Sequence, residues 1–144
     1  KTTDTSKNVV SFGDNGDGLG GYLTCVGGCG GIAAGKTAFY TTNGGWDGST
    51  STINDDSWHH VGIVLSGSTV YFYKDGIPDG SATSASPSTW SGSRAIGSSN
   101  SGASGFLTGL LDEVRVYNYA LSVDQIKRVY NQGAIFFGPT TGSP

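Results

Sequence analysis

Short runs rich in β-branched and aromatic residues recur along this chain, and turn-forming Gly, Ser, Asn and Asp separate them. Val, Ile, Thr, Tyr, Phe and Trp favour the extended backbone of a β-strand. We therefore predict about eight strands, a number and a spacing that are typical of a β-sandwich. The predicted strands lie near residues 8–13, 21–26, 36–42, 49–53, 58–65, 69–75, 93–98 and 106–121.

Composition supports this class and excludes several others. Gly accounts for 25 of the 144 residues and charged residues for only 13%, which is a turn-rich β composition suited to one domain. The net charge is −3 and the 8 Lys and Arg form no cluster, so a nucleic acid is not an expected partner. No stretch approaches the roughly 20 apolar residues that cross a bilayer, so membrane insertion by this segment is not expected either.

One segment has the period of a helix. Ser122 precedes an apolar face that includes Ile126, and Gln125 stands three residues after Ser122, which is the pattern of a capping box. We predict a short amphipathic helix on the surface of the sheets. The following residues, 134–144, are rich in Pro, Gly and Thr and are interpreted as a tail or linker. The domain is therefore expected to span residues 1–133.

The two cysteines, Cys25 and Cys29, stand close together in "TCVGGCGG". A tight turn through the two glycines between them would bring the side chains within disulfide reach. A metal site normally needs four ligands, and neither another Cys nor a nearby His supplies them. A reactive dithiol is the third interpretation, but no basic residue flanks the pair to stabilise a thiolate. We predict a disulfide, as expected in an exported protein, with free thiols as the alternative.

The chain holds two histidines, His59 and His60, directly after Trp58. Both alternating faces of residues 58–65 are largely apolar, which predicts a central strand with Trp58 in the core. Gly67 and Ser68 then turn the chain into the alternating run 69–75, which predicts a hairpin of these two runs, and Asp75-Gly76 starts the next turn. Neighbouring strand residues point to opposite faces, so the two imidazoles cannot act on one site. We interpret both as structural residues.

Two segments resemble the motifs of a known family. The sequences "DDSWHHVGIVLSGSTVYFYKDG" and "GFLTGLLDEVRVYNYALSVDQIKRVYNQG" look like the paired motifs of the laminin G-like, concanavalin A-like jelly-roll family, in the order and at about the separation found there. The resemblance covers residues 8–133. It implies an all-β fold, a two-sheet antiparallel β-sandwich of the jelly-roll type with one short C-terminal surface helix. It also implies an extracellular or cell-surface module for adhesion or carbohydrate binding.

Many members of that family bind Ca²⁺ through carboxylates and carbonyls on rim loops. The sequence "GDNGDG" offers Asp14, Asn15 and Asp17 for such oxygen coordination, although the spacing of a calcium loop is absent. A solvated turn built from the same residue types is the alternative. Ca²⁺ is therefore the one cofactor that we consider.

Related jelly rolls include glycosidases, which need two carboxyl groups facing one cleft. In "LLDEVRV" the carboxylates of Asp112 and Glu113 are adjacent and would point to opposite faces of a strand. We expect one of them to pair with Arg115 or to accept backbone hydrogen bonds. No nucleophile elbow, phosphate loop or zinc signature occurs elsewhere. The sequence predicts no catalytic residue and a chain that is not an enzyme.

Ligand recognition is expected at two tryptophans in Gly- and Ser-rich loops. Trp46 and Trp90 can stack on the apolar face of a sugar, while Asp47 can bind its hydroxyl groups. Burial of either tryptophan at the end of the core is the alternative. We expect a non-catalytic module that recognises a glycan or a cell-surface protein, as part of a larger surface or filament protein. A purely structural assembly module without a ligand is the rival function.

Residues 110–118 form a long alternating run in which Val114 and Val116 share one side. The family normally places several strands before the segment that begins near residue 8, and this chain has no counterpart for them. A sheet without those strands exposes an edge and an apolar face. We therefore expect contact with another chain, or with the rest of a longer polypeptide, through the sheet that carries Val114 and Val116.

Overall fold

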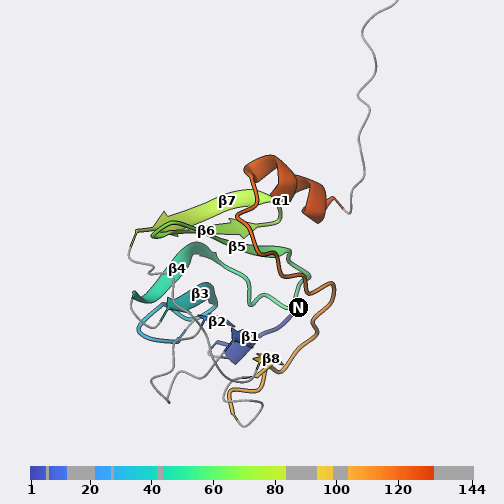
Figure 1. Ribbon diagram of the computed structural model, residues 1–144. Coiled ribbons are helices and arrows are strands. Elements are labelled where there is room, and N and C mark those ends of the chain that lie inside the picture. Colours follow the sequence, from blue (N-terminus) through green and yellow to red (C-terminus); the bar gives the residue numbers. More distant parts are fainter. Residues whose placement is uncertain are drawn as a thin grey trace, which may run out of the picture.

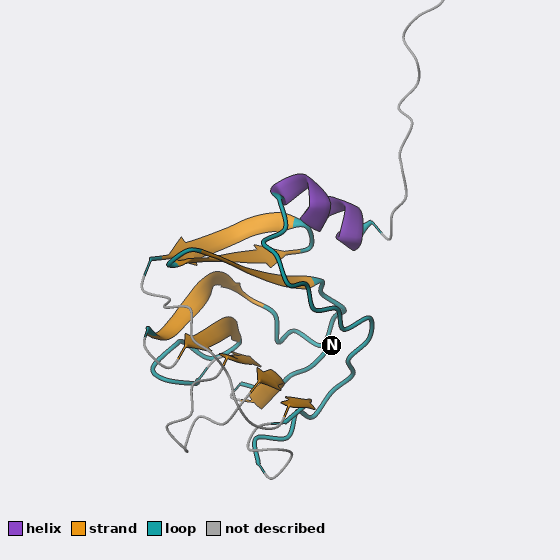
Figure 2. Ribbon diagram, viewed as in Figure 1, coloured by secondary structure: helices purple, strands orange, loops and turns teal. Residues whose placement is uncertain are grey.

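The computed structural model describes residues 1–5, 7–12, 22–26, 28–41, 44–83, 94–98 and 104–131. They form two antiparallel sheets and one helix, with strand orders β4-β3-β2-β1-β8 and β5-β6-β7 (Figures 1 and 2). The predicted two-sheet β-sandwich with one short helix is thus confirmed. The elements are β1 (Lys7–Phe12), β2 (Tyr22–Val26), β3 (Lys36–Thr41), β4 (Gly45–Thr52), β5 (Val61–Ser66), β6 (Thr69–Lys74), β7 (Ile77–Ala82), β8 (Arg94–Ile96) and α1 (Val123–Tyr130).

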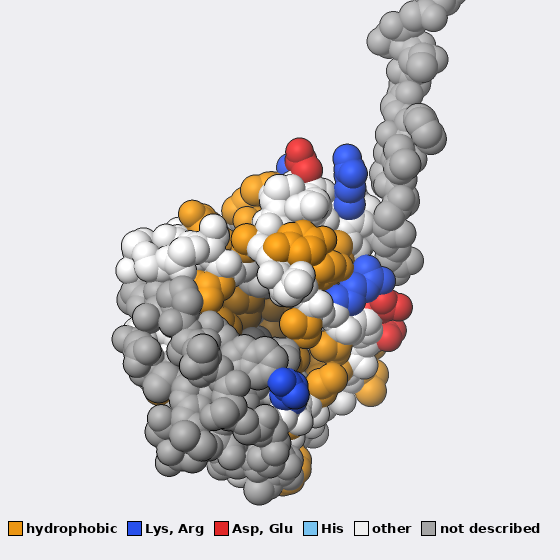
Figure 3. All heavy atoms as spheres, in the orientation of Figure 1, with side chains coloured by type: hydrophobic (Ala, Val, Ile, Leu, Met, Phe, Trp, Pro, Cys, Tyr) orange, Lys and Arg blue, Asp and Glu red, His pale blue; other side chains and the backbone are white. Residues whose placement is uncertain are grey.

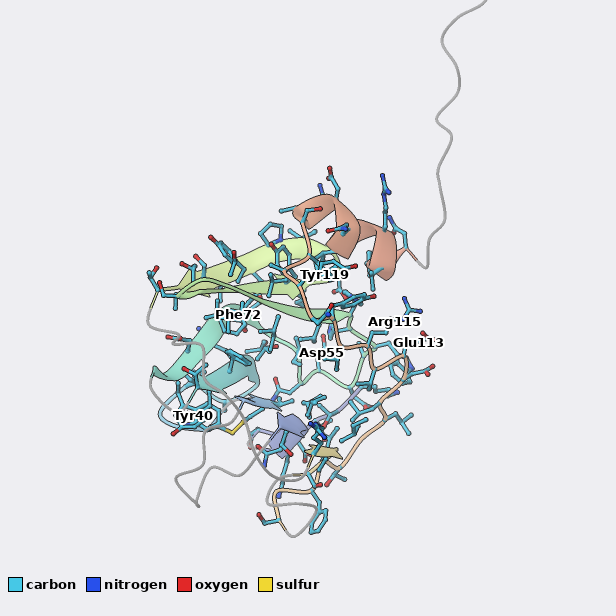
Figure 4. The ribbon with its side chains drawn as sticks, in the orientation of Figure 1. Tyr40, Asp55, Phe72, Glu113, Arg115 and Tyr119 are labelled. Atoms are coloured by element: carbon cyan, nitrogen blue, oxygen red, sulfur yellow. A yellow bond between two sulfur atoms is a disulfide. The ribbon has the colours of Figure 1, made fainter. Side chains whose placement is uncertain are left out.

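The main core lies between β3 and the three-stranded sheet. Phe39 of β3 packs with Val70 and Phe72 of β6, and Phe72 points between the two sheets in Figure 4. Apolar side chains at every second position of β6 fill this space because successive strand residues face opposite sides. The alternating residues of the neighbouring strand β5, Ile63 and Leu65, pack against the same cluster.

Helix α1 covers the outer face of the three-stranded sheet. Its residue Ile126 is only 3% exposed and packs with Val64 and Tyr73. The predicted capping box is confirmed, since the Gln125 N–H donates to Ser122 Oγ at 3.3 Å and the Ser122 N–H donates to Gln125 Oε1 at 2.8 Å. These bonds satisfy N–H groups that a helix N-terminus leaves without partners. The predicted boundary between domain and tail falls at residues that the structure does not describe.

The two sheets meet along one side of the sandwich, where β4 contacts β7. The Ser51 N–H donates to Asp79 Oδ1 at 3.0 Å, which ties the two edges together. On the other side of the molecule, residues 104–121 run from β8 to α1 past the N-terminal residues (Figure 1). The edges that face this side belong to β5 and β8.

The predicted strand at 106–121 is wrong. Its one bridge in the described part of the chain joins Gly109 to Thr2, and the residues after Gly109 form no strand. Glu113 adopts a left-handed backbone with φ of 51°, which interrupts an extended run. Alternating apolar side chains favour a strand only where a neighbouring strand can accept the backbone hydrogen bonds.

The structure also corrects the predicted position of the 58–65 run. Strand β5 begins at Val61 and lies at an edge of its sheet, so it is not a central strand. Trp58 precedes the strand and is 56% exposed, so it is not in the core. Both faces of β5 are apolar because α1 covers one of them and the main core covers the other.

Strand β7 was not predicted. Its sequence, "IPDGSA", holds a proline and a glycine, which normally argue against a strand. The preceding Asp75 and Gly76 have φ of 52° and 76°, the two positive values of a tight hairpin turn. This turn returns the chain along β6, and the edge position of β7 tolerates Pro78.

Candidate functional site

An aromatic pair lies on the five-stranded sheet. Tyr40 of β3 and Trp46 of β4 are directly opposite in the antiparallel register, and their ring centroids are 5.1 Å apart with an interplanar angle of 44°. Their neighbour Phe39 points into the core, so the pair faces away from the three-stranded sheet. Both side chains are partly exposed. Strand β4 begins four residues earlier than predicted, which places Trp46 in a strand and not in a loop.

A disulfide-closed loop supports this pair. Cys25 and Cys29 are bonded, as predicted, with their Cα atoms 6.6 Å apart, and Cys25 lies opposite Ala38 in the register of β2 and β3. Gly30 follows the disulfide and lies against the Trp46 indole so closely that a Cβ at this position would overlap the ring. Glycine is required there on two counts, since φ is also +58°.

The register separates Trp46 from the second predicted ligand residue. Asp47 lies opposite Phe39 and so starts from the other face of β4. The partner that the structure gives Trp46 on its own face is Tyr40, which the sequence interpretation missed. The signal that could have found it is the Phe-Tyr step in "KTAFYT", which puts one ring inside the sandwich and the next outside.

The other predicted ligand residues lie outside the described part of the chain. These are Trp90 and the calcium candidates Asp14, Asn15 and Asp17. They remain predictions. Among the residues that the structure describes, no group of three or more His, Cys, Asp or Glu could hold a metal ion. No helix in this part is long and apolar enough to cross a membrane.

His59 is held between two carboxylates. Its Nδ1 lies 2.9 Å from Asp75 Oδ2 and its Nε2 lies 3.0 Å from Asp55 Oδ1 (Asp55 is labelled in Figure 4). The other oxygen of Asp75 accepts the His60 N–H at 2.9 Å, so this carboxylate joins the start of β5 to the hairpin turn. The Ser57 N–H donates to Asp55 at 2.9 Å and lowers the pKa of that carboxyl. These bonds organise the loop before β5.

His60 turns to the outer side of the sheet, toward α1. Its ring lies 5.7 Å from that of Tyr130, and its Nδ1 is buried without a hydrogen-bond partner among the described residues. Burial lowers the pKa of His60; the charge of Arg115 acts in the same direction and that of Asp75 opposes it. His60 is therefore a neutral structural residue that packs against α1.

The carboxylates of Asp112 and Glu113 both accept hydrogen bonds from groups within two residues along the chain. Glu113 Oε2 accepts a hydrogen bond from Arg115 Nη2 at 2.5 Å, and this contact raises the pKa of the guanidinium (Figure 4). Asp112 Oδ1 accepts the Glu113 N–H at 2.8 Å. The expected pairing of one of these carboxylates with Arg115 is therefore present.

Exposed apolar side chains of the described residues gather on residues 106–119, which we call the apolar segment. Of the 13 large hydrophobic side chains that are exposed in the described residues, seven belong to it. They are Phe106, Leu110, Leu111, Val114, Val116, Tyr117 and Tyr119. In Figure 1 this segment runs up the right side of the molecule to α1, and Figure 3, in the same orientation, shows hydrophobic side chains around a hollow beside it. Soluble proteins seldom leave so continuous an apolar stretch in water.

Comparison with known proteins places the chain in a family. The Laminin_G_3 family model, described as the concanavalin A-like lectin/glucanases superfamily, matches residues 1–127. No curated protein is significantly similar to the chain. Among solved structures, an S-layer domain-containing protein of Clostridium thermocellum (its residues 221–444) matches with a TM-score of 0.42 and 23% identity. That match covers 88% of this chain and 63% of the other, so the chain spans less than two thirds of its length.

Proposed function

The chain belongs to the concanavalin A-like lectin/glucanases superfamily, and from this premise we propose that it is a non-catalytic binding module of the cell surface that works in contact with another polypeptide. The observation that carries the proposal is the exposed apolar segment. Val116 is 67% exposed and Leu110 is 57% exposed, although both are residue types that folded proteins bury. A partner that covers such a surface gains the favourable transfer of apolar area out of water.

The local chemistry of the apolar segment supports a binding role over catalysis. A glycosidase of this superfamily would need an acid and a second carboxylate facing one cleft. Here the Glu113 carboxylate lies against Arg115 at 2.5 Å, and Asp112 is bonded to the backbone of its own neighbour. Both carboxylates therefore stabilise the local conformation of the apolar segment.

A location outside the cytoplasm is supported by the disulfide between Cys25 and Cys29. Such bonds persist where the environment is oxidising, as on cell surfaces. Laminin G-like modules are also typical of surface and adhesion proteins. We therefore place the module in a larger surface or filament protein.

Sedimentation tests this function. The wild-type chain should associate and should bind the dye ANS, because the apolar segment is open to both. The variant Val114→Asp/Val116→Asp should sediment as a monomer and bind little ANS. The control is Ile77→Asp, a similarly exposed apolar residue of β7 outside the segment, which should behave as wild type. A wild-type chain that is a stable monomer without ANS binding would overturn the proposal.

Glycan recognition is the second candidate, and the Tyr40–Trp46 pair is the observation that favours it. Partly exposed aromatic rings can stack on the apolar face of a sugar. Trp46→Ala should abolish any signal on a glycan array, while Trp58→Ala, which removes an exposed indole elsewhere, should leave it unchanged. Binding that survives Trp46→Ala would exclude this site and move attention to Trp90.

Calcium binding by Asp14, Asn15 and Asp17 is a separate proposal, supported only by their oxygen-rich side chains. Addition of CaCl₂ should raise the melting temperature of the wild type and not of Asp14→Asn/Asp17→Asn. Equal melting temperatures with CaCl₂ and with EDTA would exclude the site.

A further inference from the structure

The edge of β5 is open to pairing. Strand β5 pairs with β6 on one side and has no strand neighbour on the other among the described residues. The backbone N–H and C=O groups on the outer side of such an edge are available to an added strand. Natural edges are commonly protected by charged side chains or by proline, and "VGIVLS" contains neither.

The apolar segment passes close to the start of β5. Arg115 is near enough for its charge to act on His60, just before β5. Ala120 and Leu121, directly after the segment, line a groove over the outer face of the sheet with Val64 of β5 and Tyr73 of β6. In Figure 1 the segment climbs past the start of β5 toward α1. Residues 111–120 nevertheless form no backbone hydrogen bond with any strand that the structure describes.

The segment is anchored at both ends and not between them. At its start, Leu110 exchanges two hydrogen bonds of 2.9 Å with Lys1, and Thr2 Oγ1 donates to the Thr108 carbonyl at 2.8 Å. Just after its end, Leu121 packs against the cluster of Val64, Tyr73 and Ile126. Residues 111–120, between these contacts, are all exposed.

We propose that the edge of β5 and the apolar segment together form an acceptor for one extended strand donated by another polypeptide. This inference rests on the proposed function and names the chemistry of its partner. The backbone groups on the outer edge of β5 have no strand partner among the described residues, and they suit a ligand with its own regularly spaced N–H and C=O groups, which an extended peptide has. A sugar offers no such repeat. Apolar side chains at every second position of the donated strand would cover Val114 and Val116, while the others face water.

A fused donor strand tests the inference. The sequence Thr-Val-Thr-Val-Thr-Val-Thr is joined through a flexible Gly-Ser linker to Lys1, whose amino group lies 2.9 Å from the Leu110 carbonyl. The control fusion replaces the central Val by Pro, which removes one backbone donor and disrupts the added strand. With the Val fusion, amide hydrogen exchange of residues 61–66 should slow by about tenfold or more, and ANS fluorescence should fall. The Pro fusion should leave both as in the unfused chain.

Two results separate this inference from the proposed function. If Val114→Asp/Val116→Asp abolishes association but the Val fusion leaves exchange in β5 unchanged, the chain binds a polypeptide by another geometry and the strand acceptor is wrong. If both fusions slow exchange equally, the protection does not depend on strand pairing and the inference is likewise overturned. Slower exchange with the Val fusion alone supports it.

Discussion

The indole of Trp46 occupies the space that any side chain on Gly30 would need. Trp46 lies in β4 and Gly30 in the loop between β2 and β3, and the disulfide between Cys25 and Cys29 fixes the loop that brings Gly30 to the ring. The aromatic pair of Tyr40 and Trp46 therefore depends on a residue that has no side chain of its own.

We predict that Gly30→Ala lowers the free energy of unfolding by about 2–4 kcal/mol, because the methyl group overlaps the indole and φ is positive. Gly31→Ala is the matched control: its φ is +86°, but nothing lies within 4 Å of the added atom. Gly31→Ala should lower the free energy of unfolding by about 1–2 kcal/mol, because only the left-handed backbone conformation disfavours the added methyl group. Urea unfolding measures both values. Equal losses for the two variants would mean that the indole does not lie on Gly30.

The disulfide gives a second prediction. Intact-mass analysis after alkylation of the native, unreduced chain should find no reactive thiol. The variant Cys25→Ala/Cys29→Ala should lose about 2 kcal/mol, the amount expected when a cross-link closes so short a loop. Two alkylated thiols in the native chain would contradict the bond. Glycan binding that fell with the double variant and not with Gly31→Ala would link the loop to the aromatic pair.

The packing of α1 gives a third prediction. Ile126→Ala should lower the free energy of unfolding by about 2–4 kcal/mol, because Ile126 is buried against Val64 and Tyr73. Lys127→Ala, one position along the same helix, removes an exposed side chain and should change it by less than about 0.5 kcal/mol. If the two variants were equally stable, α1 would not be part of the folded unit.

The elements that could be predicted from the sequence are those with local signals. The helix could be predicted from Ser122 and Gln125, because each side chain accepts a hydrogen bond from the backbone N–H of the other residue, three positions away. The hairpin of β5 and β6 followed from a run that is apolar on both faces and an alternating run, joined by a tight turn. Both depend on contacts within a few residues of the chain, so the local pattern was sufficient.

The elements that could not be predicted depend on distant partners. Residues 106–121 have a strand pattern, but no described strand bonds to them beyond Gly109, so the pattern alone does not make a strand. Strand β7 is the converse case, because its poor strand sequence is held by pairing with β6 and by the bond from Ser51 to Asp79. The partnership of Trp46 with Tyr40 and Gly30 likewise depends on register, which alternation does not determine.

The last prediction concerns pH. Burial lowers the pKa of His60 below its ordinary value of 6.5. In the unfolded chain His60 therefore takes up a proton at a higher pH than in the folded chain. Its contribution to stability is present above about pH 6.5 and is lost as the pH falls toward the folded pKa. The pKa of Asp55 is lowered from 3.8, so this carboxyl gains a proton only in more acidic solution and does not change the stability in the pH range where His60 acts.

We expect His60→Gln to lower stability at neutral pH and to flatten the decline of the wild type between about pH 7 and pH 5, because glutamine has no proton to gain. His59→Gln is the matched control: it removes the imidazole that lies between Asp55 and Asp75 and leaves the contribution of His60 in place. Urea unfolding at a series of pH values measures both slopes. Partner or glycan affinity should be nearly unchanged in His60→Gln, because the ring packs against Tyr130 of α1. A large loss of affinity at unchanged melting temperature would instead make His60 part of a binding site.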